Sequence, residues 1–125
     1  MIEARYWQTL ADQAVRCDLC PHRCVIRPGR PGICRARRNV DGRLIAWNYG
    51  KITSMAIDPI EKKPLAFFRS GSRILSIGSL GCNLRCDFCQ NWSIAQQEAT
   101  STLIEPAEMA MMAKKAAKQG SIGLA

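Results

Sequence analysis

Three cysteines in one short stretch are the sequence's clearest chemical signal. Cys82, Cys86 and Cys89 have C-x3-C-x2-C spacing and directly follow the apolar run of residues 73–78. Such thiolates can bind three irons of a 4Fe–4S cluster, which normally takes four cysteines. We therefore expect a cluster whose fourth iron has no protein ligand and can bind a small molecule. The alternative is a three-cysteine zinc site that borrows a ligand elsewhere.

The other four cysteines come earlier in the chain and form the first cysteine group, with Cys82, Cys86 and Cys89 as the second; they are Cys17, Cys20, Cys24 and Cys34, in a stretch rich in proline and glycine. Four thiols suffice for a closed tetrahedral site, so this group could hold structural zinc or an auxiliary iron–sulfur cluster. The spacing does not choose between the two. His22 could replace one thiol, although four already suffice. A bound metal would supply much of the folding free energy of this stretch.

Residues 81–92 resemble the loop that defines the radical S-adenosylmethionine superfamily, with Phe88 at its aromatic position. Their sequence is Gly-Cys-Asn-Leu-Arg-Cys-Asp-Phe-Cys-Gln-Asn-Trp. Within this superfamily, the loop sequence most resembles that of enzymes related to the activases of glycyl-radical enzymes. Among those, the chain looks most like the radical enzyme of the AmmeMemoRadiSam system. The similarity runs over nearly the whole sequence, including residues 17–34 and 58–65.

This resemblance implies an enzyme with defined cofactors. Cys82, Cys86 and Cys89 would ligate a 4Fe–4S cluster, its open iron would bind S-adenosylmethionine, and Phe88 would pack near the adenine. Reduction would yield a 5′-deoxyadenosyl radical that abstracts hydrogen from an unknown substrate, which could be a protein. The implied partners are a one-electron reductant such as flavodoxin or ferredoxin and a Memo-like protein. No residue here receives a catalytic role of its own.

Other loop residues have expected roles beside the ligands. Gly81 would let the backbone approach the cluster closely. Asn83, Gln90 and Asn91 could donate hydrogen bonds to the cluster sulfurs, or could simply cap the loop. Trp92 is expected to pack as a lid. Because the family motifs for the methionyl amine and ribose lie on later strands, the chain alone should hold a cluster poorly and turn over little.

Composition limits the alternatives. The chain has 125 residues, a formal charge of +8 and seven cysteines. The odd cysteine count disfavours a closed disulfide framework, and clustered cysteines in a reducing compartment usually mean metal. The N-terminus has no signal-peptide pattern and no apolar run could span a membrane, so a cytoplasmic protein without a membrane partner is expected.

Two other functions compete with the radical enzyme. The basic residues around the first cysteine group suggest a non-enzymatic zinc module that binds nucleic acid or protein; they are Arg27, Arg30, Arg35, Arg37 and Arg38. Few aromatic residues interleave with them, so nucleic-acid binding is disfavoured and a solvated basic face is expected. A thiol-redox protein is disfavoured because the C-x2-C pair lies in a loop instead of at a helix start.

The expected fold is α/β: the first βα unit of a partial parallel (β/α) TIM-like barrel, preceded by a metal-binding segment and a small hairpin. Its domains would be 1–40 (helix 2–15 and cysteine segment), 41–70 (hairpin and charged loop) and 71–125 (truncated barrel start). The hairpin or meander would span residues 36–57, with turns at Asp41-Gly42 and Gly50-Lys51. A strand at 73–78, a helix from Pro106 to Gly120 and a new strand would follow, and 125 residues suggest an N-terminal fragment.

Overall fold

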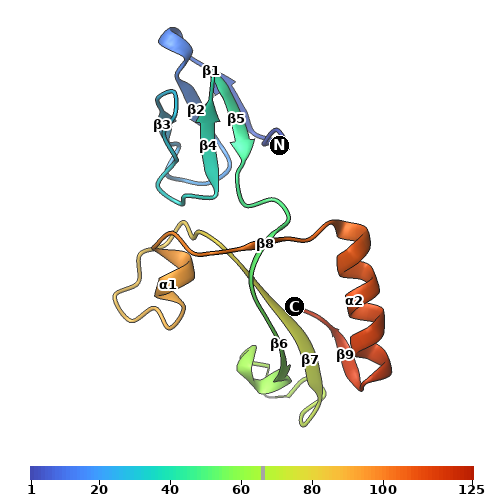
Figure 1. The fold of residues 1–125 in the computed structure, drawn as a ribbon. Helices are drawn as coiled ribbons and strands as arrows, with labels where there is room; N and C mark the ends of the chain where they lie inside the picture. The colour runs from blue at the N-terminus through green and yellow to red at the C-terminus, as the bar shows by residue number, and fades with distance from the viewer. Residues whose placement is uncertain (66) are drawn as a thin grey trace. The chain divides into compact units, whose positions relative to one another are not determined.

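The computed structural model describes residues 1–65 and 67–125. The chain forms two compact units that alternate along the sequence. The first comprises Met1–Tyr49 and Leu80–Ala99, and the second comprises Gly50–Ser79 and Thr100–Ala125. Figure 1 shows the elements of both units in chain order.

The first unit contains two small antiparallel sheets. Strands β1 (Trp7–Thr9), β2 (Val15–Cys17) and β3 (Val25–Ile26) form one sheet in that order, and β4 (Arg37–Val40) and β5 (Arg43–Ala46) form a hairpin. A short α1 (Trp92–Ala95) also belongs to this unit. Its core is small, and consists of the buried residues Ala4, Val15, Cys17, Ile26 and Leu44.

A buried polar side chain joins these sheets. Asn39 on β4 is fully buried, and its Nδ2 donates hydrogen bonds of 2.8 Å to the carbonyls of both Gln13 and Ile26. Its Oδ1 accepts a 2.9 Å bond from the backbone N–H of Gly42. Since buried polar groups must find partners to avoid a desolvation cost, this one amide fixes three segments to one another.

The second unit contains a four-stranded sheet in the order β8-β6-β7-β9. Its strands are β6 (Lys51–Pro59), β7 (Arg73–Ser79), β8 (Thr102–Leu103) and β9 (Ser121–Leu124). Helix α2 (Pro106–Lys118) leads into β9 and lies beside it (Figure 1). Proline at the first turn suits the start of α2, because its missing N–H would have no partner there.

The predicted parallel barrel start is wrong. The long strand β7 pairs antiparallel with β6 from Pro59↔Arg73 to Ile52↔Ser79, and β6 pairs antiparallel with β8 on its other side. The parallel partner of β7 is β9, at one edge of this mixed sheet. In a parallel barrel both neighbours of β7 would run parallel to it. Here one neighbour, β6, is antiparallel and directly precedes β7 among the strands of the chain.

The predicted N-terminal helix over residues 2–15 is also wrong. This segment forms β1, a short 3-10 turn (Ala11–Gln13) and β2, with Trp7 opposite Cys17 and Thr9 opposite Val15. Val15 and Cys17 are buried, and the residue between them is half-buried. That alternation has the two-residue period of a strand, and pairing of β2 with the distant β3 selects it.

Several local predictions are confirmed. The Asp41-Gly42 turn joins β4 to β5, with positive φ at both residues. The strand predicted at 73–78 is β7, and the predicted helix is α2, whose Ala116 is buried. Gly50-Lys51 does not close a hairpin, because β6 pairs with β7 and β8 instead of β5. No helix in the described part of the chain is both long and apolar enough to cross a membrane.

The charged segment after β6 is held by its own side chains. Lys62 Nζ lies 2.9 Å and Lys63 Nζ 3.7 Å from the carboxylate of Asp58. Glu61 Oε1 accepts a 2.7 Å bond from the backbone N–H of Gly71 and a 3.2 Å bond from Ser70 Oγ. These contacts tie the short 3-10 helix (Ile60–Lys62) to the loop before β7, which is a structural role.

This network predicts a pH-dependent stability. The hydrogen bond from Lys62 lowers the pKa of Asp58. The stabilisation from Asp58 is therefore complete above its unfolded pKa of about 3.9, and is lost as pH falls through the lower folded pKa. We expect Asp58→Asn to lower the thermal midpoint slightly at pH 7, by on the order of 1–3 °C, with a smaller difference at about pH 3.

Circular dichroism melts of both proteins at each pH measure this difference. Glu98→Gln is the control, because it neutralises an exposed carboxylate outside the network. An equal deficit of Asp58→Asn at both pH values would refute the assignment.

Candidate metal centre

The second cysteine group lies in a loop that is closed at its base. The backbone N–H of Gly81 donates a 2.9 Å bond to the carbonyl of Ile94, which joins the two ends of the loop 81–94 within the first unit. Within the loop the N–H of Cys89 donates a 3.1 Å bond to the carbonyl of Cys86. This turn brings two of the three predicted ligands close together, and α1 follows at once.

All three thiols of this loop are half-buried. The backbone N–H of Leu84 points at the sulfur of Cys82, with the nitrogen 3.4 Å from Sγ. N–H groups directed at sulfur stabilise negative charge there, and hydrogen bonds of this kind tune the potential of iron–sulfur centres. The loop therefore already carries one contact suited to a thiolate ligand.

Two side chains without a predicted role at this loop, those of Gln96 and Arg35, contact it or link to it. Gln96 Nε2 donates a 3.2 Å bond to the carbonyl of Cys86, and the Arg35 guanidinium donates to the carbonyl of Gln96. Arg35 is the residue after Cys34, so this chain of contacts links the two cysteine groups. No local motif marks either residue, because the contact spans 61 positions of sequence.

Gly81 packs closely against the loop that carries Cys34. Its φ is +91°, a conformation that L-residues with a side chain rarely adopt. A Cβ at this position would collide with the carbonyl oxygen of Cys34 and lie 3.1 Å from the backbone nitrogen of Ala36. Glycine is therefore required here for packing against the Cys34 loop, where the sequence had suggested an approach to the cluster.

The first cysteine group lies around one cavity of about 480 Å³ within the first unit. Its lining includes Cys17, Cys20, Cys24 and Cys34 and, from the other loop, Gly81 and Cys82. Cys17 is buried and the other three are half-buried. Burial raises the pKa of the Cys17 thiol, and the nearby thiols of Cys34 and Cys24 add to this.

None of the seven cysteines is in a disulfide. Among residues 1–65 and 67–125, no three or more Cys, His, Asp or Glu side chains are gathered closely enough to hold a metal ion as they stand. The thiols share a cavity and a loop but do not yet surround one point. Coordination by either group would therefore require the side chains to turn about their Cα–Cβ bonds.

His22 contacts the second loop. Its Nε2 lies 2.8 Å from the carbonyl oxygen of Asn83, and since a carbonyl can only accept, Nε2 must carry the hydrogen. This bond leaves only Nδ1 free to bind a metal. His22 therefore joins the two cysteine-bearing loops directly.

The remaining predicted loop residues lie at the surface. Phe88 is 90% exposed and Trp92 is 52% exposed, so Trp92 is not the packed lid that was expected. Asn83, Gln90 and Asn91 are also exposed. The Phe88 ring is accordingly free to contact a bound ligand.

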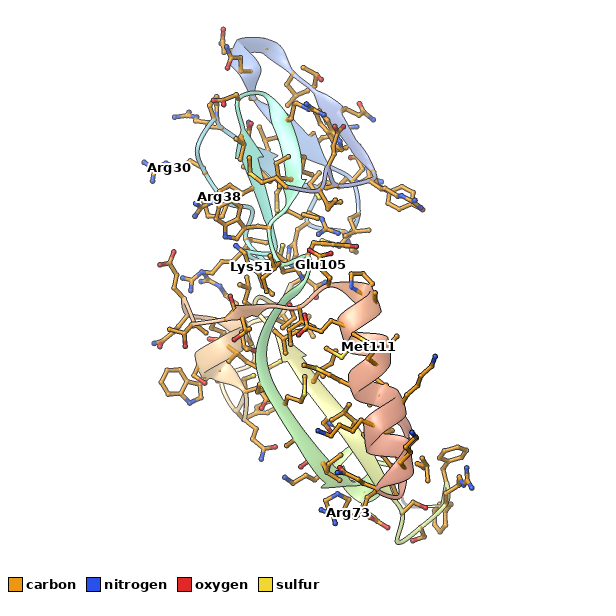
Figure 2. The ribbon with its side chains drawn as sticks, turned by 45° about the vertical axis from the view of Figure 1, so that its right-hand side comes forward. Arg30, Arg38, Lys51, Arg73, Glu105 and Met111 are labelled. Atoms are coloured by element: carbon orange, nitrogen blue, oxygen red, sulfur yellow. The ribbon has the colours of Figure 1, made fainter. Side chains whose placement is uncertain are left out.

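Three of the five arginines near the first group have partners within the protein. Arg38, labelled in Figure 2, lies 4.5 Å above the ring of Trp47. Arg37 Nη1 is 3.4 Å from Asn48 Oδ1, and Arg35 bonds Gln96. Arg27 and Arg30 are exposed. Arg35, Arg37 and Arg38 therefore stabilise the fold through contacts within the protein, and do not form a free cationic surface.

The chain is similar to a protein of Methanocaldococcus jannaschii described as "Uncharacterized protein MJ0808", with 49% identity over 96 residues. The match covers 77% of this chain but only 29% of the archaeal protein, so the chain corresponds to less than a third of that relative. No family model matches the sequence. No solved structure matches it either.

Because Gly81 packs against the Cys34 loop, replacing it by alanine should destabilise the protein more than the same replacement at Gly29. Gly29 also has positive φ, +73°, but a Cβ there would touch nothing within 4 Å. Gly29→Ala should therefore cost only the backbone strain, about 1 kcal/mol. Gly81→Ala should cost about 3 kcal/mol or more, because the backbone of the Cys34 loop must also move.

Urea unfolding followed by tryptophan fluorescence measures both costs, since Trp7, Trp47 and Trp92 all lie in the first unit. Equal losses for the two variants would show that the Gly81–Cys34 contact contributes nothing.

Proposed function

We propose that this chain carries the cofactor-binding loop of a radical S-adenosylmethionine enzyme, with Cys82, Cys86 and Cys89 as ligands of a 4Fe–4S cluster. The observation that best supports this is the grouping of three half-buried thiols in one closed loop directly after strand β7. The loop offers three thiols where a fully ligated cluster would need four.

The donor set fits this cofactor. Three soft thiolate ligands suit iron–sulfur chemistry, and the Leu84 N–H already faces the Cys82 sulfur. The exposed Phe88 ring lies between Cys86 and Cys89 in sequence, where it could pack against the adenine of S-adenosylmethionine. When bound, the cluster would supply the electron that cleaves S-adenosylmethionine to a 5′-deoxyadenosyl radical.

The residues of the chain would bind and orient. The Gly81–Ile94 and Gln96–Cys86 bonds fix the backbone that carries the thiols, so ligation would require the cysteine side chains to turn on a backbone that is already held. Free thiols and an iron–sulfur loop favour a reducing compartment, the cytoplasm. The substrate, a flavodoxin- or ferredoxin-like reductant and a Memo-like partner are proposals for the whole protein, of which this chain matches a part.

Anaerobic reconstitution with iron and sulfide tests the ligand set. We expect iron and sulfide to bind in equal amounts, up to about four irons per chain, with a 4Fe–4S absorption and electron paramagnetic resonance signature that changes when S-adenosylmethionine is added. Ala substitution of Cys82, Cys86 and Cys89 together should abolish the signature. Leu84→Ala is the matched control, because its exposed side chain lies in the same loop and offers no ligand.

Zinc in place of iron in this loop would overturn the proposal. So would a cluster that survives the triple substitution, or one whose spectrum is insensitive to S-adenosylmethionine.

Phe88 should affect cofactor binding without affecting iron content. Loss of a ring stacked on a base weakens binding by about 1–3 kcal/mol, so Phe88→Ala should reduce the affinity for S-adenosylmethionine on the order of ten-fold. Titration of the reconstituted protein, followed by the spectral change, gives the dissociation constant. Phe68→Ala removes another exposed ring, in the second unit, and should leave the constant unchanged. Equal affinities for all three proteins would exclude Phe88 from the site.

A further inference from the structure

The first cysteine group is placed by a hairpin and the loop that follows it. Strands β2 and β3 pair with Arg16 opposite Val25, which makes Cys17 and Cys24 the next opposed pair. The N–H of Cys17 donates a 2.9 Å bond to the carbonyl of Cys24, continuing the ladder. Directly opposed residues carry their side chains on the same face, with Cβ atoms about 4.5–5.5 Å apart. Two thiols therefore project together from the end of this hairpin.

The other two thiols come from the adjoining loops. Cys20 lies in the connection between β2 and β3, where its carbonyl accepts a 3.1 Å bond from the N–H of Arg23. Cys34 lies in the loop before β4, turned by a 2.9 Å bond from the N–H of Arg35 to the carbonyl of Gly32. All four cysteines line the same cavity.

The spacing of the opposed pair favours a single ion over a cluster. Zinc binds thiolate sulfur at about 2.3 Å in a tetrahedron, which sets neighbouring sulfurs about 3.8 Å apart. Cβ atoms about 4.5–5.5 Å apart allow the sulfurs of Cys17 and Cys24 to reach that separation once the side chains turn about their Cα–Cβ bonds. A cubane cluster binds each thiolate to a different iron and therefore needs the sulfurs further apart. Four thiols also complete the tetrahedron, so no position remains for substrate.

The first unit has little else to hold these loops. Six of its described apolar residues are buried, five of them in one cluster, and the apolar side chains of the loops, Leu19 and Ile33, are 50% and 45% exposed. Neither loop contains a helix. Small domains with cores of this size commonly need a metal or disulfides for stability, and no disulfide is formed here.

We infer that Cys17, Cys20, Cys24 and Cys34 form a closed site for one tetrahedral zinc ion, and that this ion fixes the surface against which the Cys82 loop packs. Two contacts carry the second half of the inference. The Cys34 loop meets the backbone of Gly81, and His22, between Cys20 and Cys24, holds the carbonyl of Asn83. Both zinc-bearing loops thus contact the residues on either side of Cys82.

Metal analysis of the 125-residue chain and its variants tests the zinc site. We expect about one zinc per chain and, after exchange with Co²⁺, the absorption of a tetrahedral tetrathiolate. Cys20→Ala together with Cys34→Ala should remove the zinc, whereas Leu19→Ala in the same loop should retain it. Replacement of Cys82, Cys86 and Cys89 by Ala should also retain it, so this site can be judged even if the proposed iron site fails.

Hydrogen exchange tests whether the zinc ion stabilises the Cys82 loop. It uses the wild-type chain, so the result does not depend on whether a substituted chain folds. Removal of zinc by a chelator should raise amide exchange in residues 81–94 at least about ten-fold, and returning zinc should reverse the change. His22→Ala should raise exchange near Asn83 while keeping zinc bound.

Three results would overturn the inference. They are a chain that binds no zinc, iron and sulfide bound by these four cysteines in place of zinc, and a Cys82 loop whose exchange is unaffected by zinc removal.

Discussion

One buried amide holds together the part of the chain that carries the cysteines. Asn39 bonds the turn between β1 and β2 at Gln13, the strand β3 at Ile26, and the turn between β4 and β5 at Gly42. The first two of these segments lie on either side of the loop that carries Cys17, Cys20 and Cys24. The Asn39 side chain and its bond to Ile26 are fully buried, so loss of the amide would leave the Ile26 carbonyl without a partner. These three directed bonds therefore add to the contacts of a small apolar core.

The two cysteine groups belong to one packed arrangement of loops. The sequence divides them by nearly fifty residues, yet Cys82 lies on the cavity that the first four cysteines line. Backbone packing at Gly81, the His22–Asn83 bond and the Arg35–Gln96 bond all join them. A loop that presents reactive thiols needs a rigid support, and here that support is another cysteine-bearing loop in place of a large hydrophobic core.

Sequence signals correctly predict the turns and helix ends that depend on neighbouring residues. They fail for elements whose structure depends on pairing with distant segments. Pro106 and Gly120 bound α2 correctly, and Asp41-Gly42 specified its turn, because both signals act within a few residues. The N-terminal segment carried apolar residues at helical spacing, but β2 became a strand through pairing with β3. The barrel was expected because a strand precedes the cysteine loop, yet β7 takes β6 as its antiparallel neighbour. Likewise the ligand candidates follow from cysteine spacing, whereas the bracing roles of Arg35 and Gln96 depend on contacts that no local pattern encodes.

The alternation of the two units along the chain has a consequence for biosynthesis. The first unit includes Leu80–Ala99, so the ribosome must finish those residues before the loops of Cys17–Cys34 can pack against the Cys82 loop. At roughly 5–20 residues per second, the early thiols spend several seconds in an unfinished unit. During that interval they are open to stray metals, oxidants and wrong pairing. Delivery of the correct ion to the nascent chain would then determine how much of the newly made protein reaches its native state.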